Sequence, residues 1–477
     1  MTNVRDIFGV SDDQLRSLVA EGLKGGGNWC DLYFEHTTFH DLLLRDSQVN
    51  SCGFHVDFGC GIRVLHGEKT GYAYAENTDF ASLLSAARAA SSIASTGRGA
   101  SCTGERCGRA RLTGTGSTRV FYGMEQDWRT ADIAGFKPFL ERLEAEIRRR
   151  DFRVIKVVAI LSSSVSEVMM YNSLDELTSD IRPLGSVSVQ IVASQNGRIE
   201  NRNVSRSLRK GAEFLSEEVL QDLAARAVDG LDSSFEAGRP KGGRMPVVMG
   251  AGASGILLHE AMGHAFEADF NRKGQSVFSD RMGSRICRNG INIVDDGTLQ
   301  DSRGAINFDD EGVPGQKTYM VTDGILTSYL HDRISAGYYG VAPTGNGRRE
   351  SFRYNPIPRM RATYMESGPD GTLEDLISSV KKGIYVNEFA NGQVKIGEGD
   401  FTFYVKSGFL IENGRLTQPV KDLNIIGNGP KALADIRAVA GDLKVDNGTW
   451  TCGKEQSVAV SCGIPSVLIG KLTVGGE

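Results

Sequence analysis

The second half of this chain is divided by turn signals into short segments, which limits the folds that it can adopt. From residue 290 onward, segments of alternating polarity are separated by Asp-Gly or Asn-Gly pairs at 296–297, 323–324 and 413–414. Such pairs favour tight turns between neighbouring strands. The composition agrees, because 58 of the 477 residues are Gly and only 12 are Pro. We therefore expect a β-rich second half.

The first half alternates amphipathic helices with strands, and the chain is too long for one ordinary core. We expect helices at 11–24, 79–95 and 131–150, and strands at 31–44, 61–65, 71–75, 153–161 and 184–194. This order predicts an α+β protein whose first half is of the α/β type, with a mixed or antiparallel sheet. The Gly-rich segment 238–243 divides the chain into an N-terminal α+β domain, 1–240, and a catalytic, metal-binding domain, 241–477. A stretch rich in Gly, Ser and Thr at 96–118 is a candidate internal linker.

Charge and hydropathy argue against several classes of function. A net charge of −5 and a pI near 5.9 provide no basic surface for direct nucleic-acid binding. No run approaches the roughly 18 apolar residues of a membrane span, and the N-terminal residues lack the apolar core of a secretion signal. The eight cysteines are scattered, as is usual for reduced thiols in the cytoplasm. We expect a cytoplasmic protein without a membrane segment.

The strongest chemical signal is His259-Glu260-Ala-Met-Gly263-His264, at the end of a helix expected over 253–268. Two His residues and a Glu at this spacing are typical of a zinc hydrolase, but the common motif is one residue shorter. On a regular helix, positions i and i+5 lie about 140° apart. A π-bulge realigns them, and Gly263 removes a side chain that would obstruct the distortion. The alternative is two ordinary polar residues at the end of an apolar helix.

A catalytic zinc site requires three protein ligands and one open position. Glu267, Cys287, Cys452 and Cys462 are candidates for the third ligand. Glu267 lies on the same helix, where the bulge is expected to turn it away from the metal. Any of the cysteines could instead be a buried structural thiol, and the residues alone do not rank them.

Several stretches give the chain a specific resemblance to the TldD/PmbA family, formerly described as modulators of DNA gyrase. The matching stretches cover nearly the whole chain and are 67–75, 258–264, 269–274, 308–316, 343–351, 410–414 and 452–455. The His-Glu-x-x-x-His motif places the chain with the catalytic, TldD-type members, because PmbA-type partners lack it.

The resemblance implies a zinc-dependent peptidase in which Cys452 joins His259 and His264 as the third ligand. It further implies that unfolded or extended peptides are cut, including precursor peptides and antitoxins. The active unit is expected to be a homodimer or a heterodimer with a PmbA-type homologous subunit.

In the expected reaction, Glu260 takes a proton from the attacking water and passes it to the leaving amine. Arg348 and Arg349 could hold the oxyanion or a substrate carboxylate, or could form ion pairs with Glu350 or another nearby acid. Asp309 could bind a substrate amine or could shape the turn that precedes Gly312.

Two other functions remain open: a peptide-binding or chaperone-like subunit with a structural zinc, and a regulatory protein linked to gyrase. A structural zinc would have four protein ligands instead of three. His36 and His40 are expected to be ordinary strand residues rather than a second metal site, and Cys102 and Cys107 lone thiols.

Overall fold

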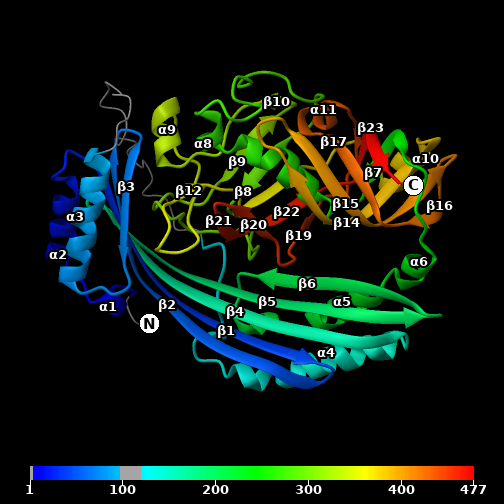
Figure 1. Cartoon of the computed structure of the whole chain (residues 1–477), viewed down its shortest axis with the longest axis horizontal. Helices are drawn as coiled ribbons and strands as arrows, with labels where there is room; N and C mark the ends of the chain where they lie inside the picture. The colour runs from blue at the N-terminus through cyan, green and yellow to red at the C-terminus, as the bar shows by residue number, and fades with distance from the viewer. Residues whose placement is uncertain (1–3, 97–119, 477) are drawn as a thin grey trace.

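Six antiparallel strands form one long, curved sheet that runs beneath the C-terminal half of the molecule (Figure 1). The computed structural model describes residues 4–96 and 120–476; the expected linker, apart from Thr96, and Cys102 and Cys107 lie outside them. The strands, in their order across the sheet, are β3 (Lys69–Ala75), β2 (Gln48–His66), β1 (Trp29–Arg45), β4 (Val154–Asn172), β5 (Leu177–Gln195) and β6 (Arg198–Leu208).

The alternation of side chains along β1 explains how one face of the sheet contributes to two separate hydrophobic cores. Cys30, Leu32 and Phe34 are buried in the core beneath one group of helices, whereas Leu42 and Leu44 are buried in a second core. All five have even numbers, so they lie on the same face of the strand. The helices of that face are α1 (Val4–Phe8), α2 (Asp12–Leu23), α3 (Phe80–Thr96), α4 (Lys137–Arg150), α5 (Glu217–Val228) and α6 (Leu231–Glu236), with short 3₁₀ turns at Ile133–Phe136 and Ala212–Phe214.

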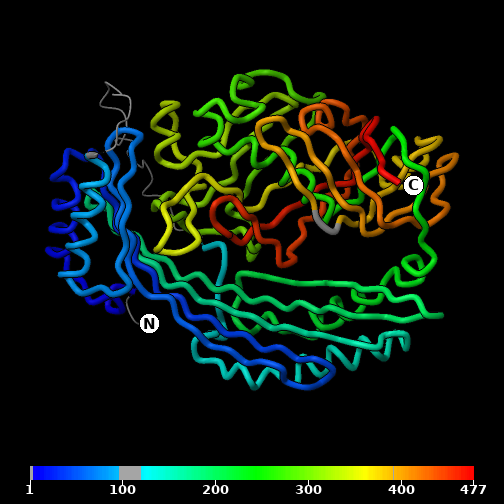
Figure 2. The backbone as a smooth tube through the Cα atoms, viewed as in Figure 1, coloured from blue at the N-terminus to red at the C-terminus, as the bar shows by residue number. Residues whose placement is uncertain are grey.

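The odd-numbered residues of β1 occupy the opposite, concave face, above which the C-terminal half lies (Figure 2). Asp31, Tyr33, Glu35 and Thr37 are all buried there although three of them are polar. The sheet therefore has an apolar face covered by helices and a polar, charged face covered by the C-terminal half.

The C-terminal half contains a closed ring of strands. The order β14-β7-β23-β17-β15 is completed by pairing between β15 and β14, while β16 and β18 are attached at its edges. The strands are β7 (Gly243–Met249), β14 (Lys382–Val394), β15 (Asp400–Glu412), β16 (Arg415–Val420), β17 (Leu423–Asn428), β18 (Ile436–Val439) and β23 (Val467–Gly475). Closure removes unpaired edges from the five central strands.

A second sheet and two small hairpins complete this half. The sheet consists of β10 (Ile325–Leu326), β9 (Lys317–Thr322), β8 (Ile293–Asp296), β13 (Ala362–Met365), β22 (Ser461–Ile464) and β19 (Lys444–Asp446). The two-stranded pairs are β11 (Gly347–Arg348) with β12 (Ile357–Pro358), and β20 (Thr451–Lys454) with β21 (Gln456–Ala459). The short helices are α7 (Gly255–Leu258), α8 (Ala268–Asn271), α9 (Arg333–Tyr339), α10 (Leu373–Ser378) and α11 (Gly429–Ala434).

The α+β class is confirmed, and the sheet of the first half is antiparallel. The strands expected at 153–161 and 184–194 are β4 and β5, which are longer than expected, whereas β6 and α5 are not among the expected elements. Across the described ranges, no helix combines the length and the apolar character needed to span a membrane.

Candidate metal centre

The two motif histidines lie on one π-helical turn, as the spacing requires. The segment His259–Gly263 is π-helical, with α7 before it and a 3₁₀ turn, His264–Phe266, after it. The wider turn rotates positions i and i+5 toward one another, and the imidazole ring centroids are 5.2 Å apart. The predicted π-bulge is confirmed. The continuous helix expected over 253–268 is wrong, because three short turns of different pitch replace it.

Gly263 is closely packed against the side chain of Met360. Its φ is −59°, which any residue can adopt. A Cβ at this position would lie 2.2 Å from the Met360 sulfur, so a side chain here would displace the turn from its neighbour. Close packing, and not backbone freedom, thus explains the glycine.

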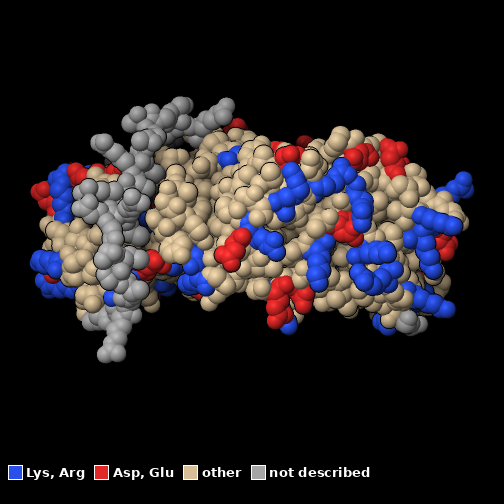
Figure 3. All heavy atoms as spheres, turned by 90° about the horizontal axis from the view of Figure 1, so that it is seen from above, with Lys and Arg blue, Asp and Glu red and all other residues tan. Residues whose placement is uncertain are grey.

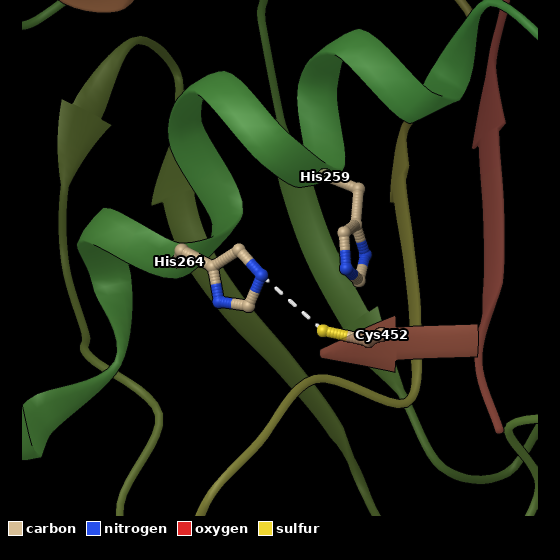
Figure 4. Close-up of side chains that lie close together, drawn as sticks. All are labelled: His259, His264 and Cys452. Atoms are coloured by element: carbon tan, nitrogen blue, oxygen red, sulfur yellow. Dashed lines mark hydrogen bonds between the residues drawn. The ribbon is translucent and has the colours of Figure 1, made fainter. Parts of the chain in front are cut away.

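Cys452 reaches the two histidines from strand β20 (Figure 4). Its Sγ lies 3.2 Å from His264 Nε2, and one ligand atom from each of the three side chains lies within 4.8 Å of the other two. A tetrahedral zinc with Zn–N near 2.0 Å and Zn–S near 2.3 Å sets its ligand atoms about 3.5 Å apart. The three side chains therefore converge at the scale of a metal site.

His259 supports the same interpretation. Its side chain is buried, yet neither ring nitrogen has a hydrogen-bond partner among the described residues. Buried polar atoms nearly always have a hydrogen-bond partner, so an imidazole without one, beside a thiol, indicates a site for a bound metal ion. Two imidazoles and a thiol form a donor set that suits zinc.

The ring of His264 is oriented from behind by Glu267. The Glu267 carboxylate lies 2.9 Å from His264 Nδ1, which leaves Nε2 toward Cys452. Lys454 donates to Glu267 at 3.0 Å and to Asp269 at 2.8 Å. Burial alone would raise the pKa of Glu267, but Lys454 and His264 lower it to about 2. Carboxylates behind a ligand histidine commonly fix its tautomer and its orientation in this way.

The same contacts govern the protonation of Cys452. Burial opposes ionisation of the thiol, but His259 and His264 prevail and lower the pKa of Cys452 to about 4. Burial likewise opposes protonation of His264, yet Glu267 and Cys452 raise its pKa to about 10. The site thus stabilises a thiolate, the form of cysteine that binds metals.

Glu260 occupies the more open side of the cluster. Its side chain retains 25% of its exposure, whereas that of His264 retains 4%. One carboxylate oxygen lies 3.9 Å from His264 Nε2, which is too long for a direct hydrogen bond but close to the point where the ligand atoms converge. This carboxylate is positioned to contact a water molecule there.

The structure separates the other candidates for the third ligand. Glu267 contacts the far nitrogen of His264 and not the convergence point. Cys287 and Cys462 are buried, but neither belongs to the group of converging ligand atoms. Burial is the main cause that raises the pKa of both thiols, to about 12 for Cys287.

Family models match three successive parts of the chain. PmbA/TldA metallopeptidase models match as domain 1 over residues 30–94, as the central domain over 126–233 and as the C-terminal domain over 242–476. The chain belongs to the PmbA/TldD metallopeptidase family.

Curated relatives and solved structures agree with this membership. A metalloprotease TldD homolog from Haemophilus influenzae is 39% identical and covers 94% of this chain and 93% of its own. A zinc metalloprotease TldD homolog from Saccharolobus solfataricus is 34% identical over 54% of this chain and 57% of its own. A proposed modulator of DNA gyrase from Thermotoga maritima shares the fold, with a TM-score of 0.77, 20% identity and coverage of 97% and 99%. TldE from Thermococcus kodakarensis also shares it, with a TM-score of 0.72, 17% identity and coverage of 97% and 100%.

The run 343–351, which contributed to the family resemblance, lies against the concave sheet and not at the metal cluster. Arg348 donates to the backbone oxygens of Met360 and Ala459. The Arg349 guanidinium lies over the Tyr33 ring at 4.2 Å and 3.6 Å from Asp31. A nearby acid, and not Glu350, is thus the carboxylate beside Arg349.

Asp309 is buried beneath the same run. Its carboxylate accepts hydrogen bonds from the backbone N–H groups of Glu311, Val313 and Gly347. Gly312, within this turn, has a φ of +79°, which favours glycine. These contacts match the turn-shaping alternative for Asp309.

The two histidines of β1 are separate from the metal cluster. His36 contacts Glu167 at 2.9 Å, and His40 packs against the Phe54 ring. Within the described ranges, only His259, His264 and Cys452 form a group of potential metal ligands.

A large surface groove is also separate from the metal cluster. It encloses about 770 Å³ and includes Arg244, Lys395, Lys431 and Lys471. Figure 3 shows many Lys and Arg side chains gathered over the C-terminal half. None of the three metal-ligand candidates lines this groove. The size of a groove therefore does not show where the candidate metal centre lies.

Proposed function

We propose that this PmbA/TldD member is a zinc-dependent peptidase that hydrolyses unfolded or extended peptides. The convergence of His259, His264 and Cys452, from segments about 190 residues apart, carries the proposal. Family membership supports peptidase chemistry, and the name of the Saccharolobus relative supports zinc in particular. The proposed catalytic unit is residues 241–477.

The three side chains would hold the metal through His264 Nε2, Cys452 Sγ and one ring nitrogen of His259. Zinc bound at such a site lowers the pKa of water and polarises a carbonyl. Because three protein ligands leave one tetrahedral position open, this donor set favours a catalytic site over a structural one.

Glu260 is the proposed general base. Its partly exposed carboxylate would accept a proton from the attacking water and deliver it to the leaving amine. His264 is held in place by Glu267 and Lys454, so this side of the site needs little rearrangement during the reaction.

The substrate-binding roles of Arg348, Arg349 and Asp309 remain proposals, and their buried contacts favour positions away from the scissile bond. The fold shared with TldE supports action as a homodimer or together with a homologous PmbA-type subunit. We propose the cytoplasm as the compartment, where the six described cysteines, all free, would stay reduced.

The test compares the wild type with Glu260→Gln, with the zinc content of each protein recorded. An unstructured peptide mixture is incubated with each, and cleavage is followed by mass spectrometry. Loss of a general base is expected to slow cleavage by about 10²–10⁴-fold at equal zinc content. If neither protein cuts, a PmbA-type subunit is added; continued inactivity would favour the peptide-binding module with a structural zinc.

A further inference from the structure

A second buried polar site lies between the concave face of the sheet and the C-terminal half. It is a cavity of about 220 Å³, and the strands β1, β5 and β21 contribute to its walls. We call it the arginine cavity because five guanidinium groups line it: Arg182, Arg209, Arg348, Arg349 and Arg361.

Three carboxylates also line the arginine cavity, and each is already engaged by the protein. Asp310 accepts hydrogen bonds from Arg182 Nη1 and from the backbone N–H of Arg349. Glu35 accepts from the Thr37 hydroxyl and the Phe352 N–H, and Glu350 accepts from the Ser457 N–H. Two of the five guanidinium groups have a carboxylate within ion-pair distance: Arg182 pairs with Asp310 and Asp180, and Arg349 lies 3.6 Å from Asp31. The other three, Arg209, Arg348 and Arg361, have none among the described residues.

Arg209 is the most isolated of the five. It is only 8% exposed, and although its backbone N–H donates to Asp301, its guanidinium has no hydrogen-bond or ion-pair partner in the described part of the chain, and its Nε is fully buried. Its one specific contact is with the Tyr122 ring, at 5.3 Å. Burial, the largest influence, lowers the pKa of this guanidinium. Because arginine stays protonated in proteins, a positive charge without a direct ion-pair partner lies at the wall of the cavity.

Arg348 and Arg361 add to the positive excess. The Arg348 guanidinium donates to the backbone oxygens of Met360 and Ala459. The Arg361 guanidinium donates to the backbone oxygen of Gly345, and one of its terminal nitrogens has no acceptor among the described residues. Neither has a carboxylate within ion-pair distance among the described residues, and burial lowers the pKa of both. Neutral acceptors satisfy N–H groups but do not balance charge.

We propose that the arginine cavity binds an oxyanion, either the carboxylate or the phosphate group of a small ligand. Guanidinium forks match the planar or tetrahedral oxygens of both groups. The cavity is smaller than the roughly 300 Å³ at which drug-sized pockets begin, so the ligand is a small anion or the end of a larger molecule. The proposal is independent of peptidase activity.

The test measures anion binding to the full chain by calorimetry and by thermal unfolding. Inorganic phosphate, N-acetylalanine and N-acetylalanine amide are each titrated at constant ionic strength, with chloride as the reference. We expect saturable binding of phosphate or of N-acetylalanine, and none of the amide. Binding of phosphate alone identifies a phosphate-type ligand, whereas binding of N-acetylalanine alone identifies a carboxylate.

Two arginine variants distinguish a site from a general charge effect. Arg209→Met is expected to weaken anion binding at least about tenfold and to raise the Tm of the anion-free protein, because it removes an uncompensated charge. Arg303→Met is the control for loss of buried positive charge: Arg303 is equally buried and also has no carboxylate partner among the described residues, but it hydrogen-bonds to Trp450 and Ser207 and does not line the cavity. The absence of saturable binding, or equal weakening in both variants, would overturn the proposal.

Discussion

The metal centre and the arginine cavity share the β20–β21 hairpin but have opposite chemical requirements. At the metal centre, the ring nitrogens of His259 have no hydrogen-bond partner within the described ranges and lie next to the thiol of Cys452. In the arginine cavity, the buried Nε–H of Arg209 has no acceptor among the described residues. The first arrangement calls for a cation and the second for an anion. A buried polar group without a hydrogen-bond partner therefore indicates that a ligand binds beside it, and the nature of the group indicates the charge of that ligand. This holds even for Arg209, which belongs to no sequence motif.

Removing one metal ligand tests the first half of this comparison and has the largest expected effect. Cys452→Ala should lose most of its zinc, since one ligand of three contributes on the order of several kcal/mol to metal binding. Cys462→Ala is the matched control, because it is equally buried but outside the cluster. Zinc content after exposure to a chelator is the measurement. Equal retention in the two variants would remove Cys452 from the site.

A paired buried arginine provides the contrast for Arg209. Arg63 is fully buried and forms ion pairs with Asp31 at 2.7 Å and Glu311 at 2.6 Å. Arg63→Met removes the ion-pair partner of the buried Glu311 and leaves Asp31 with only Arg349, at 3.6 Å, and we expect a loss of about 3–5 kcal/mol in the free energy of unfolding. Urea unfolding measures this loss. Arg209→Met is expected to change stability in the opposite direction, and destabilisation by both variants would contradict the distinction between paired and unpaired arginines.

The two regions also differ in how far the sequence predicts them. The π-helical turn follows from His259 and His264 alone, because an i, i+5 pair cannot share a ligand on a regular helix. The choice of Cys452 required the family resemblance, since the contact spans 188 positions and depends on the β20–β21 hairpin. Lys454 could have been found from its position, as residues i and i+2 of a strand share a face.

Of the arginine cavity, the sequence indicates only Arg348 and Arg349, through the run 343–351, and the rest cannot be predicted for a physical reason. Arg209 and Arg361 belong to different halves of the chain and to no motif, and they meet only because the C-terminal half covers the concave sheet. The length of β4 was underestimated for a related reason. Its Ser162-Ser163-Ser164 run interrupts the apolar alternation, although Ser163 is buried in the folded protein. A polar face that another part of the chain covers cannot be told from a solvent-exposed one by periodicity.

Acidity provides a smaller test of the charged interface. Burial raises the pKa of Glu35 to about 7 against the hydrogen bonds from Thr37 and Phe352. The folded state therefore holds this proton more tightly than the unfolded state, whose pKa is near 4.5. The contribution to stability is present below pH 4.5 and is lost as the pH rises through 7.

Glu35→Gln keeps a neutral, hydrogen-bonding side chain at every pH. Relative to the wild type, we expect the variant to gain roughly 2–3 kcal/mol of stability between pH 4.5 and pH 8. Urea unfolding at the two pH values measures the gain, with the exposed Glu398→Gln as control. A difference from the wild type that does not change with pH would rule out a buried, protonated Glu35.

The smallest expected effect concerns the orientation of the metal ligand. Lys454→Met removes the donor that holds Glu267 behind His264, and zinc affinity should fall about 10–100-fold. Competition with a chelator measures the affinity, and the Tm of the metal-free protein is recorded beside it. Asp269→Asn is the matched control, because it weakens the other contact of Lys454 and leaves the one to Glu267. A fall in Tm without a change in zinc affinity would show that Lys454 supports the fold rather than the ligand. Loss of affinity in Lys454→Met alone would instead extend the metal centre to a chain of contacts from Lys454 through Glu267 to His264.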